Sequence, residues 1–303
     1  MNRLVAIIGP TGIGKSSLAL ELGQRFDGEI VNADSRQVYR YMDIGTAKPT
    51  ADERALVPHH LVDMVDPDQP FSLALYQNQA REAIDDVQRR GKLPLLVGGS
   101  GLYVWAVLEG WQVPAVPPDS GLRQELEARA RAEGVEALYH ELEQVDPAAA
   151  ERIDPRNVRR VIRALEVSRQ GKLFSQLQTK MPFVDSLVIG LTAERADLYR
   201  RIDARVDAMM ERGLLAEVEG LVARGFGLDL PSMSGLGYRQ IGAYLQGKTS
   251  MASAVQQIKF DTHRFARHQY AWFRLKDERI RWFEPQQGLV ENVAGLIQHF
   301  SAD

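Results

Sequence analysis

The sequence predicts an α/β fold, in which helices pack on both faces of a parallel sheet. Four short apolar runs indicate buried strands, because each run is continuous rather than alternating. We expect these strands at residues 4–8, 29–33, 93–97 and 187–191. Helical patterns over residues 16–26 and 72–91 lie between successive strands. Strands that alternate with helices are typical of a parallel sheet covered by its connecting helices.

A phosphate-binding motif follows the first predicted strand. The segment GPTGIGKS matches the pattern G-x-x-x-x-G-K-[ST] between a strand and a helix. Its glycines let backbone N–H groups surround an anion, and the next helix points its positive end at the same place. The expected diphosphate-binding residues are Gly9, Pro10, Thr11, Gly12, Ile13, Gly14, Lys15 and Ser16. With the predicted sheet, this motif indicates a P-loop NTPase-like fold; the alternative is an ordinary glycine-rich turn.

Lys15 and Ser16 have further expected roles in this loop. Lys15 adds a positive charge beside the anion, and the hydroxyl of Ser16 can bind Mg²⁺. The motif therefore predicts a bound polyphosphate, with Mg²⁺ as the cofactor and Ser16 as its ligand. It specifies neither adenine nor hydrolysis.

Asp34 and Ser100 are the expected polar groups at the carboxyl ends of the second and third predicted strands. An ATPase needs a carboxylate after an apolar strand to hold Mg²⁺, but the run 93–97 ends in GGSG. The ends of parallel strands face one crevice, so the phosphate loop, Asp34 and Ser100 should converge there. An anion site, a carboxylate and a hydroxyl favour a transferase in which Asp34 accepts a proton. The alternatives are a helix cap or outer Mg²⁺ contact for Asp34 and a turn residue for Ser100.

Composition sets limits on the class of protein. The chain of 303 residues has no cysteine, which excludes disulfides, Cys-ligated zinc and thiol nucleophiles. Its formal net charge is −3, so nucleic-acid binding would require Lys and Arg to gather on one face. No apolar run approaches the ~20 residues that span a membrane, and no signal-peptide pattern is present. We expect a soluble, cytoplasmic monomer with no membrane partner.

Two breaks in the pattern predict an inserted domain. The proline-rich stretch 113–121 and the segment DPR at 154–156 flank a run of charged helical sequence. We therefore expect an inserted helical subdomain at 116–155. The remaining segments, 1–115 and 156–303, would form the catalytic core with its C-terminal helices.

Two basic segments are candidate nucleic-acid surfaces. In RNVRRVIRALE, helical spacing places Arg156, Arg159, Arg160 and Arg163 on one stripe, which favours phosphate-backbone binding over a solvated face. In KFDTHRFARHQYAWFRLK, the basic residues fall on one ridge among aromatic residues. They are Lys259, His263, Arg267 and Arg274. Basic and aromatic interleaving suits looped RNA, and the alternative is a core helix with extended arginines.

Four segments together resemble the tRNA dimethylallyltransferases of bacteria. They are GPTGIGKSSLA, NADSRQVYRYMDIGTAKP, LLVGGSGLYVWAVLEG and GLGYRQ, and their order and spacing match that family over nearly the whole chain. The resemblance implies that the phosphate loop holds dimethylallyl diphosphate with Mg²⁺. The acceptor would be the exocyclic amine of the adenine just 3′ of the anticodon, flipped into a channel through the protein.

The resemblance also implies roles for individual residues. Asp34 would bind the amine and take its proton, and Ser100 would help the leaving diphosphate. Lys15 and Arg205 would neutralise that diphosphate, with Arg201 a weaker candidate than Arg205. The residues that match tRNA-contacting positions are Asp34, Ser35, Arg36, Gln37, Ser100, Arg123, Arg159, Arg160, Arg163, Gly237, Tyr238, Arg239, Arg267, Gln269 and Arg274. The inserted subdomain would close over the anticodon stem.

This chain departs from the family pattern at a few positions, and two other functions compete. Ser16 and Ser100 stand where threonine is commoner, and both keep the hydroxyl. His268 and Ala271 replace an arginine and a threonine, which affects the expected backbone contacts there. The alternatives are a nucleoside or shikimate-type kinase and a non-catalytic RNA-binding NTPase switch. Modification of RNA without ATP distinguishes the transferase from both.

Overall fold

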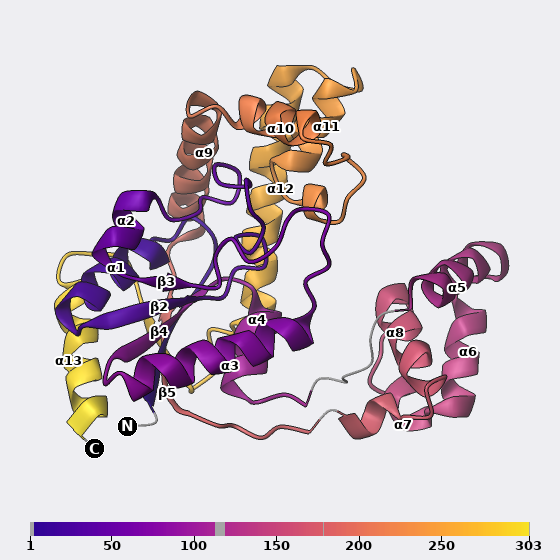
Figure 1. Cartoon of the computed structure of the whole chain (residues 1–303), viewed down its shortest axis with the longest axis horizontal. Coiled ribbons are helices and arrows are strands. Elements are labelled where there is room, and N and C mark those ends of the chain that lie inside the picture. The colour runs from indigo at the N-terminus through magenta and orange to yellow at the C-terminus, as the bar shows by residue number, and fades with distance from the viewer. Residues whose placement is uncertain (1–2, 113–118, 178, 303) are drawn as a thin grey trace. The chain divides into compact units, whose positions relative to one another are not determined.

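The computed structural model describes residues 3–112, 119–177 and 179–302, and these residues form an α/β fold (Figure 1). Within them, six parallel strands form one sheet in the order β3-β2-β4-β1-β5-β6. The strands are β1 (Arg3–Ile8), β2 (Gly28–Asn32), β3 (His59–His60), β4 (Leu93–Gly98), β5 (Asp185–Leu191) and β6 (Ile280–Phe283). The predicted fold class is confirmed, as are the four expected strands to within two residues.

Helices cover both faces of the sheet. Alternate residues of each strand point to opposite faces, so apolar side chains on both faces are buried by these helices. Val5, Ile7 and Leu95 pack in the cluster that includes α1 (Lys15–Arg25) and α13 (Leu289–Ala302). The neighbouring Leu96 is also fully buried, on the side of α3 (Leu73–Arg89) and α4 (Gly101–Leu108). This double burial explains why each central strand is a continuous apolar run.

The C-terminal third is mainly helical and supplies one wall of the site described below. Its helices are α9 (Arg195–Glu211), α10 (Leu214–Ala223), α11 (Tyr238–Leu245) and α12 (Met251–Trp272), with a 3-10 turn at Ser232–Ser234. Helix α9 packs on α12, and α11 packs on both α10 and α12. A short helix α2 (Ala51–Leu56) precedes β3. None of the helices in the described residues is both long and apolar enough to span a membrane.

The chain forms two compact units, and the inserted unit is longer than the sequence predicted. Unit 1 comprises Met1–Leu108 and Phe183–Asp303, and unit 2 comprises Glu109–Pro182. The predicted end of the insertion at residue 155 is wrong, because α8 (Val158–Ser168) packs on α5 and α6 within unit 2. The predicted beginning at 116 lies outside the described residues.

Unit 2 has a hydrophobic core of its own. Its other helices are α5 (Ser120–Glu133), α6 (Val135–Val145), α7 (Pro147–Ala150) and the 3-10 turn Phe174–Leu177. Leu126, Leu138 and Leu142 pack against Val161 and Leu165 of α8. The segment DPR, expected to be a domain boundary, instead lies inside the unit, just before α8.

Candidate active site

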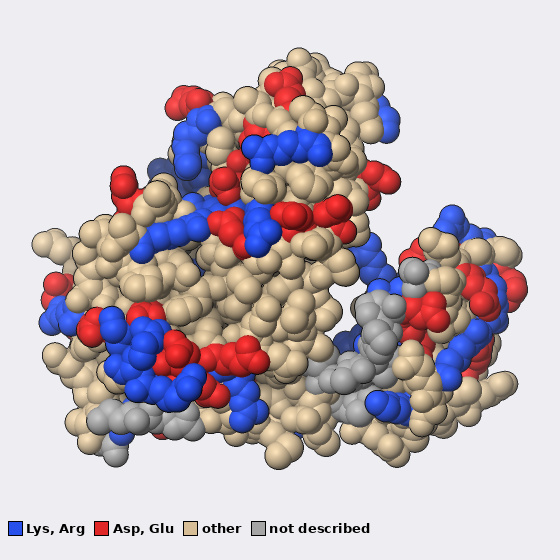
Figure 2. Space-filling view, viewed as in Figure 1, with Lys and Arg blue, Asp and Glu red and all other residues tan. Residues whose placement is uncertain are grey.

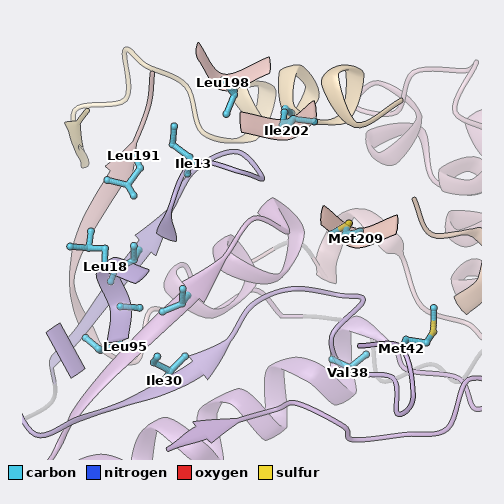
Figure 3. Packing of buried hydrophobic residues seen from close by; sticks show 14 of the residues in the cluster. Ile13, Leu18, Ile30, Val38, Met42, Leu95, Leu191, Leu198, Ile202 and Met209 are labelled. Atoms are coloured by element: carbon cyan, nitrogen blue, oxygen red, sulfur yellow. The ribbon is translucent and has the colours of Figure 1, made fainter. Parts of the chain in front are cut away.

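The phosphate loop begins directly after β1 and has the backbone conformation that an anion cradle requires. Gly9, Gly12 and Gly14 have φ of 141°, 79° and 103°, which favour glycine. A Cβ on Gly9 would lie 2.5 Å from the carbonyl oxygen of Leu191, so that position also lacks room for a side chain. Ile13 points away into the core beside Leu198 and Ile202 of α9 (Figure 3). The buried Ile13 therefore anchors the loop.

A cavity in unit 1 brings the phosphate loop together with Asp34 and Arg205. Its lining residues are Thr11, Lys15, Ser16, Leu20, Ile30, Asn32, Asp34, Gln37, Ala47, Pro49, Glu53, His59, Val97, Gly98, Gly99, Arg205, Phe265 and Gln269. They come from the strands and the loops that follow them, from the phosphate loop, and from helices α1, α2, α9 and α12. The predicted convergence of the loop and Asp34 is therefore present.

Lys15 and Arg205 give the cavity a positive character. Lys15 lies at the start of α1, and its ammonium group donates a hydrogen bond to the carbonyl oxygen of Pro10 at 2.8 Å. Burial and the nearby Arg205 lower the pKa of Lys15 to about 7, against an opposing effect of Asp34. Burial also lowers the pKa of Arg205, which Asp34 partly offsets. Bringing an anion between these groups would stabilise both positive charges.

Arg205 is held on α9 in a fixed relation to the loop. One turn earlier on that helix, Ile202 is fully buried, and its side chain lies close to Gly12. The weaker candidate, Arg201, is exposed and does not line the cavity. The geometry therefore favours Arg205 over Arg201 as the arginine that meets a bound diphosphate.

Asp34 is held by a tight turn after β2. The side chain of Asn32 accepts a hydrogen bond from the backbone N–H of Asp34 at 2.9 Å and donates to its carbonyl oxygen at 3.1 Å. One carboxylate oxygen of Asp34 accepts a hydrogen bond from the backbone N–H of Arg36 at 2.9 Å. Among the described residues, the other carboxylate oxygen has no hydrogen-bond partner, so it is left for a ligand. The turn explains why a carboxylate in this position faces the cavity rather than solvent.

Ser100 contacts the Asp34 loop rather than the cavity. Its hydroxyl oxygen accepts a hydrogen bond from the backbone N–H of Ser35 at 3.0 Å and lies 3.2 Å from the Ser35 hydroxyl. Ser100 also caps α4, since its carbonyl accepts hydrogen bonds from the first turn. It is not among the cavity-lining residues. In this structure, Ser100 therefore positions the loop that carries Asp34.

Gln269 joins two loops of the site, a role that the sequence prediction missed. Its side-chain oxygen accepts a hydrogen bond from the backbone N–H of Thr11 at 2.9 Å. Its amide nitrogen donates to the carbonyl of Gly99 at 2.8 Å. We expected a tRNA contact here, but Gln269 is only 4% exposed and both ends of its amide bond to the protein backbone. It connects the phosphate loop to the GGSG segment.

The residues present fit a magnesium ion that is held largely by its substrate. Ser16 is exposed and lines the cavity, so its hydroxyl is available as a ligand. The described residues contain no group of three or more His, Cys, Asp or Glu side chains that could hold a metal alone. Mg²⁺ commonly binds through a few protein groups together with phosphate oxygens and water, and this donor set suits that arrangement.

Part of the predicted tRNA-binding set at 36–37 and 237–239 instead stabilises unit 1. Gly237 and Tyr238 are buried in this structure, so neither presents a side chain at the surface, and their tRNA contacts stay a prediction. The Tyr238 hydroxyl donates to Glu217 at 2.6 Å, and burial together with Glu217 raises its pKa. Arg36 donates hydrogen bonds to the carbonyls of Pro231 and Ser232.

Gln37 and Arg239 differ from these residues in that each keeps one accessible side. Gln37 donates to the carbonyls of Thr46 and Ala47, and it also lines the cavity. Arg239 is exposed, although its guanidinium pairs with Asp261 at 2.8 Å. Both remain candidates for contact with RNA.

Some of the arginines predicted to bind tRNA in unit 2 form ion pairs within the protein, and others do not. Arg123 and Arg163 both form ion pairs with Glu166, which is completely buried. Their first role is thus to neutralise that carboxylate, and hydrogen bonds from both lower its pKa against the effect of burial. In the described residues, the exposed Arg159 and Arg160 have no ion-pair partner. These two are the best candidates for phosphate contacts.

Arg156 does not belong to the helical stripe that we predicted. The helix begins at Val158 with Asn157 as its cap, so Arg156 precedes it. Arg156 forms an ion pair with Asp154 at 2.7 Å, and both side chains are largely exposed.

Two of the four residues in the basic ridge predicted on α12 lie beside acids on α9. Lys259 forms an ion pair with Asp207 at 2.7 Å, and His263 lies 2.8 Å from Asp203. Helix α12 ends at Trp272, so Arg274 lies beyond the helix, and it is exposed, as is Arg267. On the face that Figure 2 shows, Lys and Arg are mixed with Asp and Glu rather than gathered in one surface.

Several cavity residues were not predicted from the sequence, although one of them had a usable signal. Asn32 precedes Asp34 by two residues and orders its turn, a spacing that an Asx-type turn could have indicated. Phe265 is 44% exposed on α12 and lines the cavity, as does His59, the first residue of β3. Burial is the main cause of a lowered pKa for His59.

Comparison with known proteins decides the family. The profile of the IPP transferase family matches residues 37–276. The chain belongs to the IPP transferase family. Among curated relatives of this family member, a tRNA dimethylallyltransferase of Roseiflexus castenholzii is 58% identical, over 98% of each chain. One of Thermomicrobium roseum is 51% identical, over 97% of this chain and 90% of the relative.

Solved structures of the same family also resemble this chain. The tRNA isopentenylpyrophosphate transferase of Bacillus halodurans is 41% identical, with a TM-score of 0.74 over 99% of this chain and 96% of that one. A eukaryotic dimethylallyltransferase acting on tRNA is 27% identical, with a TM-score of 0.83 over 98% of this chain and 78% of that one. These matches confirm the family that the sequence motifs indicated.

Proposed function

We propose that this IPP transferase family member is a tRNA dimethylallyltransferase. It transfers a dimethylallyl group from dimethylallyl diphosphate to the exocyclic amine of the adenine 3′-adjacent to the anticodon of tRNA, and it releases diphosphate. The observation that carries this proposal is the cavity in which the phosphate loop, Lys15, Arg205 and Asp34 meet. The high identity to curated tRNA dimethylallyltransferases supports the same substrates.

The positive groups of the cavity act on the leaving group. The backbone N–H groups of the phosphate loop, the start of α1, Lys15 and Arg205 would surround the diphosphate. As the bond between allylic carbon and oxygen breaks, negative charge grows on the diphosphate and these fixed positive groups stabilise it. Mg²⁺, when bound through Ser16 and phosphate oxygens, would add positive charge to the same oxygens.

Asp34 acts on the acceptor. The exocyclic amine of adenine is a weak nucleophile because its lone pair is delocalised into the ring, so positioning and a nearby base both help. The free carboxylate oxygen of Asp34 would accept a hydrogen bond from the amine. As the new bond between nitrogen and carbon forms, the amine loses a proton to Asp34. Its turn, fixed by Asn32, Arg36 and Ser100, keeps the carboxylate in place.

Exposed arginines in both units would hold the tRNA by its backbone. Arg159 and Arg160 of unit 2 and Arg239, Arg267 and Arg274 of unit 1 are exposed. Arginine at the surface contributes salt-dependent contacts to phosphates rather than sequence specificity. The chain's net charge of −3 makes such local positive groups necessary.

The experiment that tests this function measures transfer of label to RNA. Purified protein, Mg²⁺, radiolabelled dimethylallyl diphosphate and unmodified tRNA are mixed without ATP, and label in precipitated RNA is counted. The matched control is the same tRNA with the target adenine replaced by guanine. We expect label on the first RNA and none on the second. No label on either RNA, with ATP consumed when small nucleosides are added, would contradict the proposal.

A further inference from the structure

A second positive cluster lies on helices α9 and α12, among residues that do not line the cavity. The phenolic oxygen of Tyr199 accepts a hydrogen bond from the Nε of Arg195 at 3.0 Å and from a terminal nitrogen of Arg267 at 2.9 Å. The ring of Tyr199 stacks on His263, with centroids 3.9 Å apart and an angle of 5°. The stack fixes the phenol, and the phenol holds the two guanidinium groups together.

The charges of Arg195 and Arg267 are not neutralised by the protein. In the described part of the chain, neither guanidinium has a carboxylate within ion-pair distance, and both residues are exposed. Neighbouring basic residues on the same two helices differ. Arg200 pairs with Asp197 and Lys259 pairs with Asp207, while His263 lies beside Asp203. Two like charges held on one oxygen repel each other unless an anion joins them.

The hydrogen-bond donors of this cluster that have no partner favour a ligand whose atoms are all hydrogen-bond acceptors. Each guanidinium has five N–H donors and uses one of them on Tyr199. The phenolic proton of Tyr199 has no acceptor among the described residues. Burial raises the pKa of Tyr199, but hydrogen bonds from Arg195 and Arg267 outweigh it and lower the pKa overall. Phosphate oxygens accept from all of these donors.

We propose that Arg195, Tyr199 and Arg267 form a phosphate-binding site, separate from the phosphate loop, for a backbone phosphate of the tRNA. The site rests on the proposed function for its ligand. Both guanidiniums would donate to the phosphate oxygens while keeping their bonds to Tyr199, and the phenol would donate its own proton. The same chemistry would also accept free inorganic phosphate or diphosphate, so the two sources must be separated by experiment.

The test compares tRNA affinity and its salt dependence across matched variants. Arg195→Gln and Arg267→Gln each remove one charge, Tyr199→Phe removes the hydroxyl and keeps the ring on His263, and Arg200→Gln removes a neighbouring charge that is already paired. Dissociation constants for labelled tRNA are measured at several salt concentrations, with thermal melts to check folding. Inorganic phosphate and diphosphate are titrated separately against each variant.

We expect Arg195→Gln and Arg267→Gln each to weaken tRNA binding about three- to tenfold at low salt and to reduce the salt slope by about 0.7 to 0.9. Tyr199→Phe should weaken binding without changing the slope, and Arg200→Gln should match the parent. Diphosphate affinity at the phosphate loop should be the same in all variants, because that loop is untouched. An Arg195→Gln variant that binds diphosphate more weakly but binds tRNA as tightly as the parent would contradict a tRNA-backbone site.

Two further outcomes separate this site from the proposed function. If the parent transfers label to tRNA and Arg195→Gln keeps the parent's affinity and slope, the site is wrong and the function stands. If the parent binds no tRNA, the proposed function fails and the site fails with it.

Discussion

The phosphate loop and helix α12 contact each other at the cavity, but they differ in how well their roles can be predicted from the sequence. The loop works through its backbone: three glycines with positive φ direct N–H groups inward, and Ile13 anchors them. Helix α12 works through side chains, and what each does depends on its partner. Lys259 and His263 face acids on α9, whereas Gln269 faces the loop itself. A backbone motif can therefore be recognised in sequence, while a helical pattern of charges is ambiguous.

The largest expected effect tests the group that acts on the acceptor. Asp34→Asn keeps the turn, because the side-chain oxygen can still accept from the N–H of Arg36, but it removes the base. We expect turnover to fall by about 10²–10⁴-fold with tRNA affinity within about threefold of the parent. Single-turnover transfer and filter binding measure the two quantities. A variant as active as the parent would exclude Asp34 as the base.

Gln269 tests whether the contact between helix and loop organises the site. Gln269→Ala leaves the N–H of Thr11 and the carbonyl of Gly99 without partners, at a cost of about 1–3 kcal/mol each. We expect a lower free energy of unfolding and about tenfold or greater loss of diphosphate affinity, with tRNA affinity nearly unchanged. Denaturant unfolding and calorimetry measure these effects.

The exposed neighbour of Gln269 provides the control for that prediction. His268→Ala alters the same turn of α12 without touching either loop, so it should match the parent. Loss of tRNA affinity alone in Gln269→Ala, with diphosphate binding intact, would restore the surface role that we had expected.

Arg159 and Arg160 sharpen the contrast between paired and unpaired charges. The double variant Arg159→Gln with Arg160→Gln should weaken tRNA binding about tenfold at low salt and reduce the salt slope by about 1.4 to 1.8. Arg156→Gln is the matched control, because that exposed arginine is paired with Asp154. Equal salt slopes for the double variant and its control would show that these two arginines face solvent and do not contact phosphates.

Lys15 should bind a proton together with the diphosphate. In the free protein its pKa is lowered to about 7, so the amine is largely neutral above that pH. A bound anion raises the pKa again, so binding at pH 8 should take up part of one proton. Calorimetry in buffers of different ionisation enthalpy measures the uptake. Lys15→Arg, which stays charged, should show none, and equal uptake in both proteins would contradict this origin.

Lys259 carries the smallest expected effect. Its ion pair with Asp207 is partly exposed, and such pairs contribute about 0–1 kcal/mol. Lys259→Met should therefore lower the free energy of unfolding by less than about 1 kcal/mol and leave tRNA affinity unchanged. A clear loss of tRNA affinity in filter binding would show that Lys259 itself contacts RNA.

The sheet and the phosphate loop could be predicted because their signals are local. Each central strand is buried on both faces, and Asp34 lies two residues after the end of β2. The edge strands were missed for a physical reason: β3 has only His59 and His60, and β6 has an exposed Arg281 within a short run. Strands with fewer buried positions leave a weaker pattern.

The rest of the site depends on contacts that are distant in sequence. Gln269 bonds to Thr11 and Gly99, which lie 258 and 170 positions away, and no local pattern indicates such partners. The boundary of unit 2 was misplaced for the same reason. Val161 and Leu165 show that α8 has an apolar face, but only the structure shows that this face packs in unit 2.

We propose that the phosphate loop binds a prenyl diphosphate and not ATP. The most direct test measures equilibrium binding of an unreactive thiolo analogue of dimethylallyl diphosphate in the presence of Mg²⁺, with ATP and diphosphate as competitors. We predict that the analogue binds, that diphosphate displaces it and that equimolar ATP does not. Tight ATP binding with no measurable binding of the analogue would contradict the assignment of this loop.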